Sequence, residues 1–221
     1  MNHDRLASIA LSLGVCALAF GACSTNDGSP DVQAAAPALD EADEPQTDGY
    51  AVASAILHDA SGARIGRIRF RSDGETTHVR VNAQLPESEG GTTRGIHVHA
   101  NDDASNGEGC VADPAAPASE HFVSADGHYN PGDATHGGHA GDLPALILTH
   151  TGTAAASFIT DRFQADELVG RAIVLHAKSD NYGNVPVGDA PNQYTPNSDE
   201  ATDLTQRTGN AGDRYACGVI E

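Results

Sequence analysis

The fold class is decided by residues 64–85, RIGRIRFRSDGETTHVRVNAQL. In the first half, Ile68 and Phe70 alternate with arginines, which is typical of a strand with one buried and one solvated face. A polyanion or a partner chain could also bind such arginines, but a solvated strand face is the simpler interpretation. Ser72-Asp73-Gly74-Glu75 favours a turn, and alternation resumes from Thr76. Two alternating strands joined by a short turn predict antiparallel β-sheet.

Further strands are predicted on both sides of this hairpin, which gives about eight in total. They are expected at residues 50–57, 95–99, 143–149, 154–163, 171–176 and 214–220. No helical period of useful length is found, and one short helical turn is expected at 166–169. Residues 181–213 are expected to form a long loop without regular structure, and such loops usually have functional reasons. An all-β domain is therefore predicted.

Charge narrows the choice of partners. The net charge of -19 argues against binding to nucleic acid and against electrostatic attraction to anionic lipid. From Gly49 onward, 23 acidic residues still outnumber 11 basic ones. Such a domain repels an anionic substrate unless a local positive group overrides the field.

The first 48 residues are interpreted as export and tethering segments. A short apolar run predicts a signal peptide over residues 1–22. Phe20-Gly21-Ala22-Cys23 resembles a lipoprotein box and favours lipidation of Cys23, whereas Ala17-Leu18-Ala19 fits a soluble-secretion site. Residues 23–48 contain seven acids and no Lys or Arg, which predicts a disordered acidic tether. Residues 49–221 are then one exported domain, either membrane-anchored or periplasmic or extracellular.

Cysteine use agrees with export. Cys16 belongs to the leader and Cys23 is the lipidation candidate, so Cys110 and Cys217 remain as an even pair in an oxidising compartment. A bridge between them would close a loop of about a hundred residues, for which the chain-entropy model gives about 4–5 kcal/mol. Two free thiols are the alternative.

Histidines gather in two patterns. In Gly95-Ile96-His97-Val98-His99 the two imidazoles project from one face of a strand and can hold one metal ion, unless both are simply exposed. His176 ends an apolar strand, where a capped core histidine is the alternative.

The second pattern is residues 128–142, HYNPGDATHGGHAGD, whose glycines and Pro131 predict a loop. Its candidate ligands are His128, His136, His139 and Asp142. Three imidazoles and one carboxylate are a ligand set that tetrahedral Zn²⁺ prefers, although a solvated His/Gly loop is the alternative.

With these residues assembled, the chain resembles the copper/zinc superoxide dismutases in their bacterial secreted form. The resemblance is carried, in the family's order, by 95–100 (GIHVHA), 124–131 (SADGHYNP), 139–146 (HAGDLPAL), 171–180 (RAIVLHAKSD) and 208–220 (TGNAGDRYACGVI). It covers the chain from about Tyr50 to the end. It implies an eight-stranded antiparallel Greek-key barrel with two long active-site loops, one copper and one zinc ion per chain, and dismutation of superoxide to O₂ and H₂O₂.

The resemblance also implies roles for single residues. The implied copper ligands are His97, His99, His128 and His176. The implied zinc ligands are His128, His136, His139 and Asp142, with His128 as bridge and proton carrier. Asp180 matches a carboxylate joining a copper-ligand histidine to a zinc-ligand histidine. Cys110 and Cys217 match the family disulfide, and Arg214 matches the arginine that draws the anion to copper.

The chain departs from the family between the second and third zinc histidines. The family usually has several more residues there, whereas this chain has only Gly137-Gly138. Either the glycines let both rings reach one ion, or His136 is displaced and zinc is held more weakly, with His121 as the reserve candidate. The other histidines, His58, His78 and His150, are expected to be exposed or structural.

Two other function classes are compatible with these residues. One is a non-catalytic copper/zinc-binding module of the same fold, which loss of a copper ligand or of Arg214 would favour, but neither is missing. The other is a zinc hydrolase with a three-histidine site, which needs neither Arg214 nor a fourth copper-side nitrogen. Superoxide is the expected partner, membrane contact is expected only through a lipid on Cys23, and monomer and homodimer both remain open.

Overall fold

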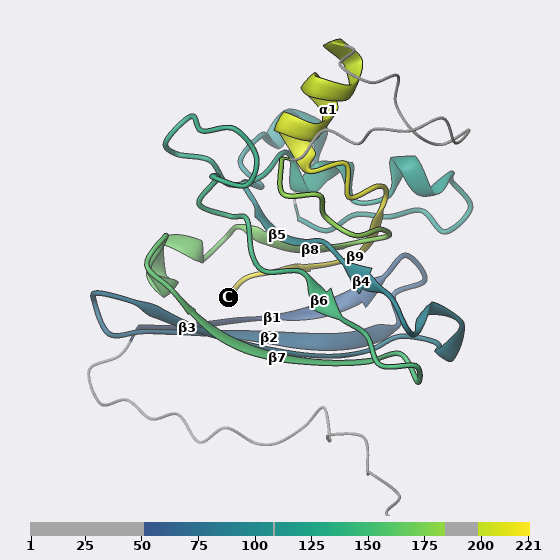
Figure 1. Ribbon diagram of the computed structural model, residues 1–221, viewed down its shortest axis with the longest axis horizontal. Helices are drawn as coiled ribbons and strands as arrows, with labels where there is room; N and C mark the ends of the chain where they lie inside the picture. Colours follow the sequence, from purple (N-terminus) through teal and green to yellow (C-terminus); the bar gives the residue numbers. More distant parts are fainter. Residues whose placement is uncertain (1–50, 108, 184–198) are drawn as a thin grey trace, which may run out of the picture. The chain divides into compact units, whose positions relative to one another are not determined.

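The structure is a computed structural model that describes residues 51–107, 109–183 and 199–221 (Figure 1). The predicted signal peptide, Cys23 and the acidic tether lie outside the described residues, as does part of the predicted loop at 181–213. Within the described ranges, no helix has the length and apolarity needed to cross a bilayer.

Seven strands form one antiparallel sheet in the order β5-β8-β9-β1-β2-β3-β7. Their bounds are β1 Ala51–Asp59, β2 Arg64–Ser72, β3 Thr77–Gln84, β5 Ile96–His99, β7 Thr153–Thr160, β8 Ala172–His176 and β9 Arg214–Val219. The sheet curls, so that β5, β8 and β9 face the layer of β1, β2, β3 and β7 (Figure 1). Two short strands, β4 (Thr93–Arg94) and β6 (Leu146–Ile147), pair with each other. The predicted antiparallel β class is confirmed.

The β2–β3 hairpin forms as its alternation predicts. Ile68 pairs with Val81 and Phe70 pairs with Val79, and these four side chains are at most 1% exposed. Asp73 holds the turn because its carboxylate accepts hydrogen bonds from two backbone N–H groups, those of Glu75 and Thr76. Burying each large apolar side chain contributes about 1.5–3 kcal/mol, and this burial fixes the register of the hairpin.

The hydrophobic core lies inside the curl of the sheet. Its largest fully buried members are Leu57, Ile68, Phe70, Leu85, Ile96, Leu146, Leu168, Ile173, Leu175 and Ile220. On β5, Ile96 and Val98 belong to this core, so His97 and His99 project from the opposite face of the strand. The sheet thus gives two histidines a rigid base away from the apolar core.

The expectation that the domain lacks helices is wrong in one place, because α1 spans Asp199–Thr208 (Figure 1). Leu204 is its only apolar side chain among those described, so the segment has no apolar period to read. The helix ends just before Gly209, whose φ of 60° lies in the left-handed region. A tertiary contact also holds this end, because the backbone N–H of His136 donates to the carbonyl of Gln206 at 2.6 Å. Contact with the segment of His136, rather than a period in the sequence, places this helix.

Other local differences are small. The strand expected at 143–149 is reduced to β6, and β4 and β5 are separated by Gly95 alone. The helical turn expected at 166–169 is present as η5. The 3-10 helices are η1 Glu87–Glu89, η2 Ala104–Asn106, η3 Ala118–Glu120, η4 Val123–Ala125 and η5 Ala165–Leu168.

A disulfide joins Cys110 to Cys217, with the two Cα atoms 5.5 Å apart. Cys217 lies in β9 opposite Val174 of β8, and Cys110 packs against the small buried cluster around Phe122 and Ala125. The bridge therefore fastens the long connection after β5 to the main sheet.

Candidate metal centre

The histidine cluster is built around the edge strand β5. One side of β5 pairs with β8, which ends at His176. On its other side the loop 128–142 runs alongside, with isolated bridges from His97 to Asp142 and from His99 to His128. Gly141 makes this approach possible, because a Cβ there would lie 2.3 Å from the carbonyl oxygen of Val98. Segments that are distant in sequence thus place their histidines side by side.

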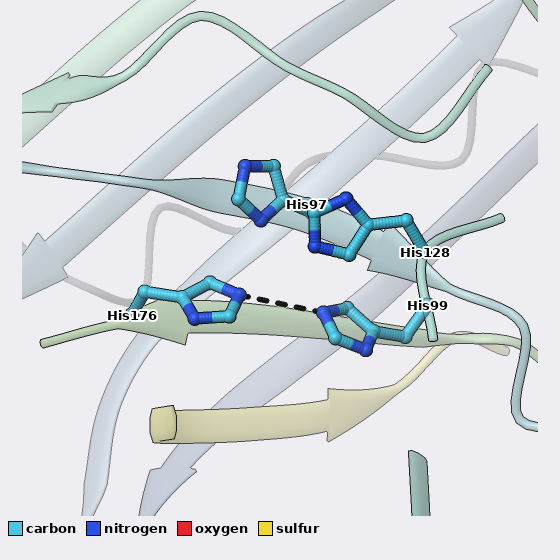
Figure 2. Close-up of side chains that lie close together, drawn as sticks. All are labelled: His97, His99, His128 and His176. Carbon is cyan, nitrogen blue, oxygen red and sulfur yellow. Dashed lines mark hydrogen bonds between the residues drawn. The ribbon is translucent and has the colours of Figure 1, made fainter. Parts of the chain in front are cut away.

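Four imidazoles form the first group, namely those of His97, His99, His128 and His176. One ring nitrogen from each lies within 4.8 Å of those of the others. Figure 2 shows the rings turned toward one another, with Nε2 of His99 3.4 Å from Nε2 of His176. Imidazole nitrogens at this spacing suit a copper ion in either oxidation state. We call this group the copper cluster.

In three rings of the copper cluster, the nitrogen that faces away from the other rings is hydrogen-bonded to another part of the protein. Nδ1 of His99 donates to the carbonyl of Asp126 at 2.8 Å, and Nδ1 of His176 donates to that of Gly212 at 3.1 Å. Nε2 of His97 lies 2.6 Å from Oδ2 of Asp180. Such hydrogen bonds set the tautomer, so the opposite nitrogen of each ring carries the free lone pair.

The second group holds a carboxylate at its centre. Oδ1 of Asp142 lies 2.9 Å from Nδ1 of His128 and 3.2 Å from Nδ1 of both His136 and His139. Nδ1 of His128 and Nδ1 of His139 are also 3.2 Å apart. Bonds of about 2.0–2.1 Å to a tetrahedral Zn²⁺ require ligand atoms about 3.3–3.4 Å apart, close to these distances. We call these four residues the zinc cluster.

By distance alone, His97 also groups with His128, His136 and Asp142. The Nε2 atom of His97 is held by Asp180, however, whereas Nδ1 of His139 directly contacts both Asp142 and His128. The contact pattern therefore favours His139 as the fourth zinc-side residue.

The hydrogen bonding of three ring nitrogens inside the two clusters shows whether metal ions fit there. Nδ1 of His97, Nε2 of His128 and Nδ1 of His136 are buried without a hydrogen-bond partner among the described residues. Buried polar atoms are normally satisfied, so these need an explanation. Metal ions provide one, because each of these nitrogens belongs to a ring that contacts the rest of its cluster. The residues present therefore fit a copper and a zinc ion.

Asp180 connects the two clusters. Its carboxylate accepts from Nε2 of His97 at 2.6 Å and from Nε2 of His136 at 2.8 Å, and also from the backbone N–H of Tyr182 at 2.7 Å. Gly209, after α1, packs so closely that a Cβ there would lie 2.1 Å from Oδ1 of Asp180. The carboxylate is therefore fixed by contacts on all sides.

The electrostatics suit metal binding. Burial and neighbouring histidines lower the pKa of His97, His99 and His176, and they take the pKa of His128 to about 3. A neutral imidazole is the form that coordinates a metal. The copper cluster therefore presents four neutral rings across the physiological pH range.

The carboxylates and His136 behave differently. Burial opposes ionisation of Asp142 and Asp180, but hydrogen bonds from histidines hold the pKa of each carboxyl well below its usual range. For His136 burial also opposes the charge, yet the nearby carboxylate of Asp142 and the hydrogen bond to Asp180 raise its pKa to about 9. Zinc binding to this ring at neutral pH would therefore displace a proton.

The structure places His136 in the zinc cluster despite the short spacer. Gly137 makes this possible, with a φ of 88° that a side chain would disfavour. The reserve candidate His121 belongs to neither cluster, since its Nε2 contacts the carbonyl of Ala116 instead.

Sequence reasoning missed Arg162, which clamps this loop. Its guanidinium donates to the carbonyls of His139 at 3.0 Å, Asp142 at 3.1 Å and Gly137 at 3.2 Å. A planar fork of donors suits such a set of carbonyls. An isolated arginine after a strand gives no sequence signal for this role.

A pocket of about 800 Å³ opens onto the histidines. His99, His128, His139, His176 and Arg214 line it, together with residues of α1. The guanidinium of Arg214 is oriented by the carbonyls of Phe122 and Asp126. The pocket thus combines a fixed cation with the edges of the metal-binding rings, on a protein whose net charge is negative.

Comparison with known proteins agrees with this geometry. Residues 64–220 match the family described as copper/zinc superoxide dismutase (SODC). The chain is 31% identical over 241 residues to a superoxide dismutase (Cu-Zn) of Mycobacterium bovis, with 99% of this chain and 95% of the relative covered. It is 32% identical over 181 residues to an extracellular superoxide dismutase (Cu-Zn) of Brugia pahangi, covering 77% and 75%. The Cu/Zn superoxide dismutase structure from Brucella abortus superimposes with a TM-score of 0.55 at 23% identity, over 77% of this chain and all of that one, and so supports the fold alone.

Proposed function

The chain belongs to the copper/zinc superoxide dismutase family, and we propose that its two clusters divide the work of superoxide dismutation between them. Copper would be held by His97, His99, His128 and His176, and zinc by His128, His136, His139 and Asp142. The observation that carries this division is the set of buried nitrogens on His97, His128 and His136 that form no hydrogen bond within the described part of the chain.

Bound copper supplies the one-electron chemistry that converts two superoxide ions and two protons into O₂ and H₂O₂, and bound zinc supplies a fixed positive charge. His128 carries one of the protons on Nε2, the nitrogen that the copper cluster surrounds. Its Nδ1 faces the zinc cluster, so the ring keeps its place while Nε2 gains and loses the proton. The carboxylate of Asp180 accepts from both His97 and His136, one ring from each cluster. It therefore fixes the position of the copper cluster relative to the zinc cluster.

The proposed function is tested by metal content and by turnover. We expect isolated residues 49–221 to bind about one copper and one zinc ion per chain and to consume superoxide only when copper is present. Elemental analysis and a superoxide-consumption assay measure the two quantities. Protein that takes up zinc alone, or that consumes no superoxide when loaded with copper, would contradict the proposal.

Arg214 is proposed to draw the anion to copper. A fixed cation in a pocket can raise the rate of anion capture by a factor of 10 or more, and salt screens such attraction. We therefore expect Arg214→Ala to lower kcat/KM about tenfold at low ionic strength and to flatten its dependence on salt. Stopped-flow assays over a salt series measure both effects.

Two matched variants distinguish the effect of where the positive charge lies from the effect of the charge itself. Arg64→Ala removes the same charge from an exposed position on β2 and should leave the salt dependence unchanged. Arg214→Lys keeps the charge but not the fork that contacts two carbonyls, so an intermediate rate is expected. An unchanged rate in Arg214→Ala would refute the guiding role.

The finer fold is proposed to be an eight-stranded Greek-key barrel. β4 continues into β5 after Gly95 and can be counted with it as one strand, which leaves eight. The pairing of β4 with β6, whose chain runs on to β7 at the far edge of the main sheet, supports closure of the barrel.

The processing of the chain is also a proposal. Residues 1–22 act as a signal peptide, 23–48 as an acidic tether and 49–221 as the catalytic domain. The existence of an extracellular relative supports export. Mass spectrometry of the mature N-terminus distinguishes a lipidated Cys23 from cleavage after Ala19. Monomer and homodimer remain open alternatives, which light scattering separates.

A further inference from the structure

Asp126 holds a backbone conformation that side-chain-bearing residues rarely adopt. Its φ is 64° and its ψ is -158°, a region populated almost only by glycine. A residue with a Cβ persists there only when the surrounding structure fixes it. The contacts of Asp126 should therefore show what this conformation accomplishes.

The carboxylate of Asp126 is fastened to the segment that follows β5. Oδ2 accepts from the backbone N–H groups of Asp102 at 2.7 Å and Asp103 at 2.9 Å. Oδ1 accepts from the side-chain amide of Asn106. Three hydrogen bonds thus hold the residue to a turn that begins three positions after His99.

The carbonyl oxygen of Asp126 points the other way, into the metal centre. It accepts from Nδ1 of His99 at 2.8 Å and from a guanidinium nitrogen of Arg214. One oxygen atom therefore sets the orientation of a copper-cluster ring and of the cation in the same pocket. Phe122 supplies the other carbonyl that holds Arg214.

We propose that Asp126 is a positioning residue for superoxide dismutation. Its carboxylate, anchored on residues 102–106, fixes the carbonyl that orients His99 and Arg214 together. The inference rests on the proposed function of the copper cluster. It adds a role for a residue that contacts neither substrate nor metal.

Two substitutions separate the carboxylate from the backbone shape. Asp126→Gly accepts the same φ and ψ without strain but removes all three side-chain hydrogen bonds. Asp126→Asn keeps one acceptor for the N–H groups of Asp102 and Asp103, and its amide can donate to Asn106 once that side-chain amide turns over. Asp73→Gly is the matched control, because Asp73 anchors the β2–β3 turn through the same kind of bonds away from the clusters.

The full-length protein loaded with copper and zinc is used for each variant. In Asp126→Gly we expect an altered Cu²⁺ EPR spectrum, a fall in kcat/KM of about tenfold at low salt and a flatter salt dependence, as for loss of other groups that orient a ligand. Asp126→Asn should restore the wild-type spectrum and stay within about threefold of the wild-type rate, because its hydrogen bonds are retained. Combining Asp126→Gly with Arg214→Ala should slow turnover by less than the product of the two single effects, since both remove the contact between Arg214 and the carbonyl of Asp126, while the effect through His99 remains.

Several outcomes would overturn the inference. If Asp126→Gly lowers only thermal stability and keeps the wild-type spectrum and salt dependence, its role is structural. Equal changes in Asp73→Gly, or fully additive effects with Arg214→Ala, would do the same. If the wild-type protein itself fails to consume superoxide, the proposed function fails, whereas the EPR comparison still tests whether Asp126 orients His99.

Discussion

His176→Ala should reduce superoxide consumption by copper-loaded protein to the background of the metal-free protein. The ring of His176 is buried and supplies Nε2 to the copper cluster, 3.4 Å from Nε2 of His99. Its other nitrogen is held by the carbonyl of Gly212, which fixes the orientation of the ring. Losing a partner that orients a ligand already costs about 10–100-fold in affinity or activity, so losing a ligand should cost more.

The variant carries its own internal control, because His176 is not part of the zinc cluster. We expect zinc content to stay near one per chain while copper binding weakens, which elemental analysis after dialysis shows. His150→Ala removes an exposed histidine outside both clusters and should behave as wild type. A His176→Ala protein that consumes superoxide as fast as wild type at saturating copper would exclude this residue as a ligand.

The parts of this site that were predictable are those with a local rule behind them. His97 and His99 lie two residues apart on a strand, so the backbone alone puts them on one face. The alternation around Ile68 and Phe70 predicts their burial in the same way. These predictions need no knowledge of which segments meet in space.

The remaining features depend on contacts between distant segments. Whether His136 reaches the zinc cluster is decided by Gly137, by Asp180 and by the end of α1, not by the length of the spacer. Helix α1 itself is shaped by that same packing. The role of Arg162 rests on backbone carbonyls as partners, and that of Asp126 on backbone N–H groups and on its own carbonyl. Nearly every residue has these backbone groups, so residue type cannot reveal either role.

Removal of the disulfide should have the largest effect on stability. The bridge joins residues 107 positions apart and restricts the unfolded chain. For a loop of this length, the chain-entropy model gives a loss of about 4–5 kcal/mol in folding stability when the bridge is removed. We expect replacement of both Cys110 and Cys217 by alanine to lower the free energy of unfolding by this amount. Urea titration of the metal-free protein measures it without the added contribution of metal binding. A change below about 1 kcal/mol would show that the bridge does not act through the unfolded chain.

The same double variant should also slow turnover, because a series of contacts connects the disulfide to Arg214. The residues flanking Cys110 are bonded to the segment of Phe122: the N–H of Phe122 donates to the carbonyl of Val111 at 2.8 Å, and the hydroxyl of Ser124 donates to that of Gly109 at 2.6 Å. Phe122 in turn supplies a carbonyl to Arg214, which lies in β9 three residues before Cys217. Without the bridge, the segment of Cys110 and Phe122 is no longer attached covalently to β9, so Arg214 is positioned less firmly. We therefore expect kcat/KM to fall and to lose part of its salt dependence even under conditions where the variant is fully folded. If the folded variant keeps the wild-type salt dependence, the disulfide stabilises the domain without positioning Arg214.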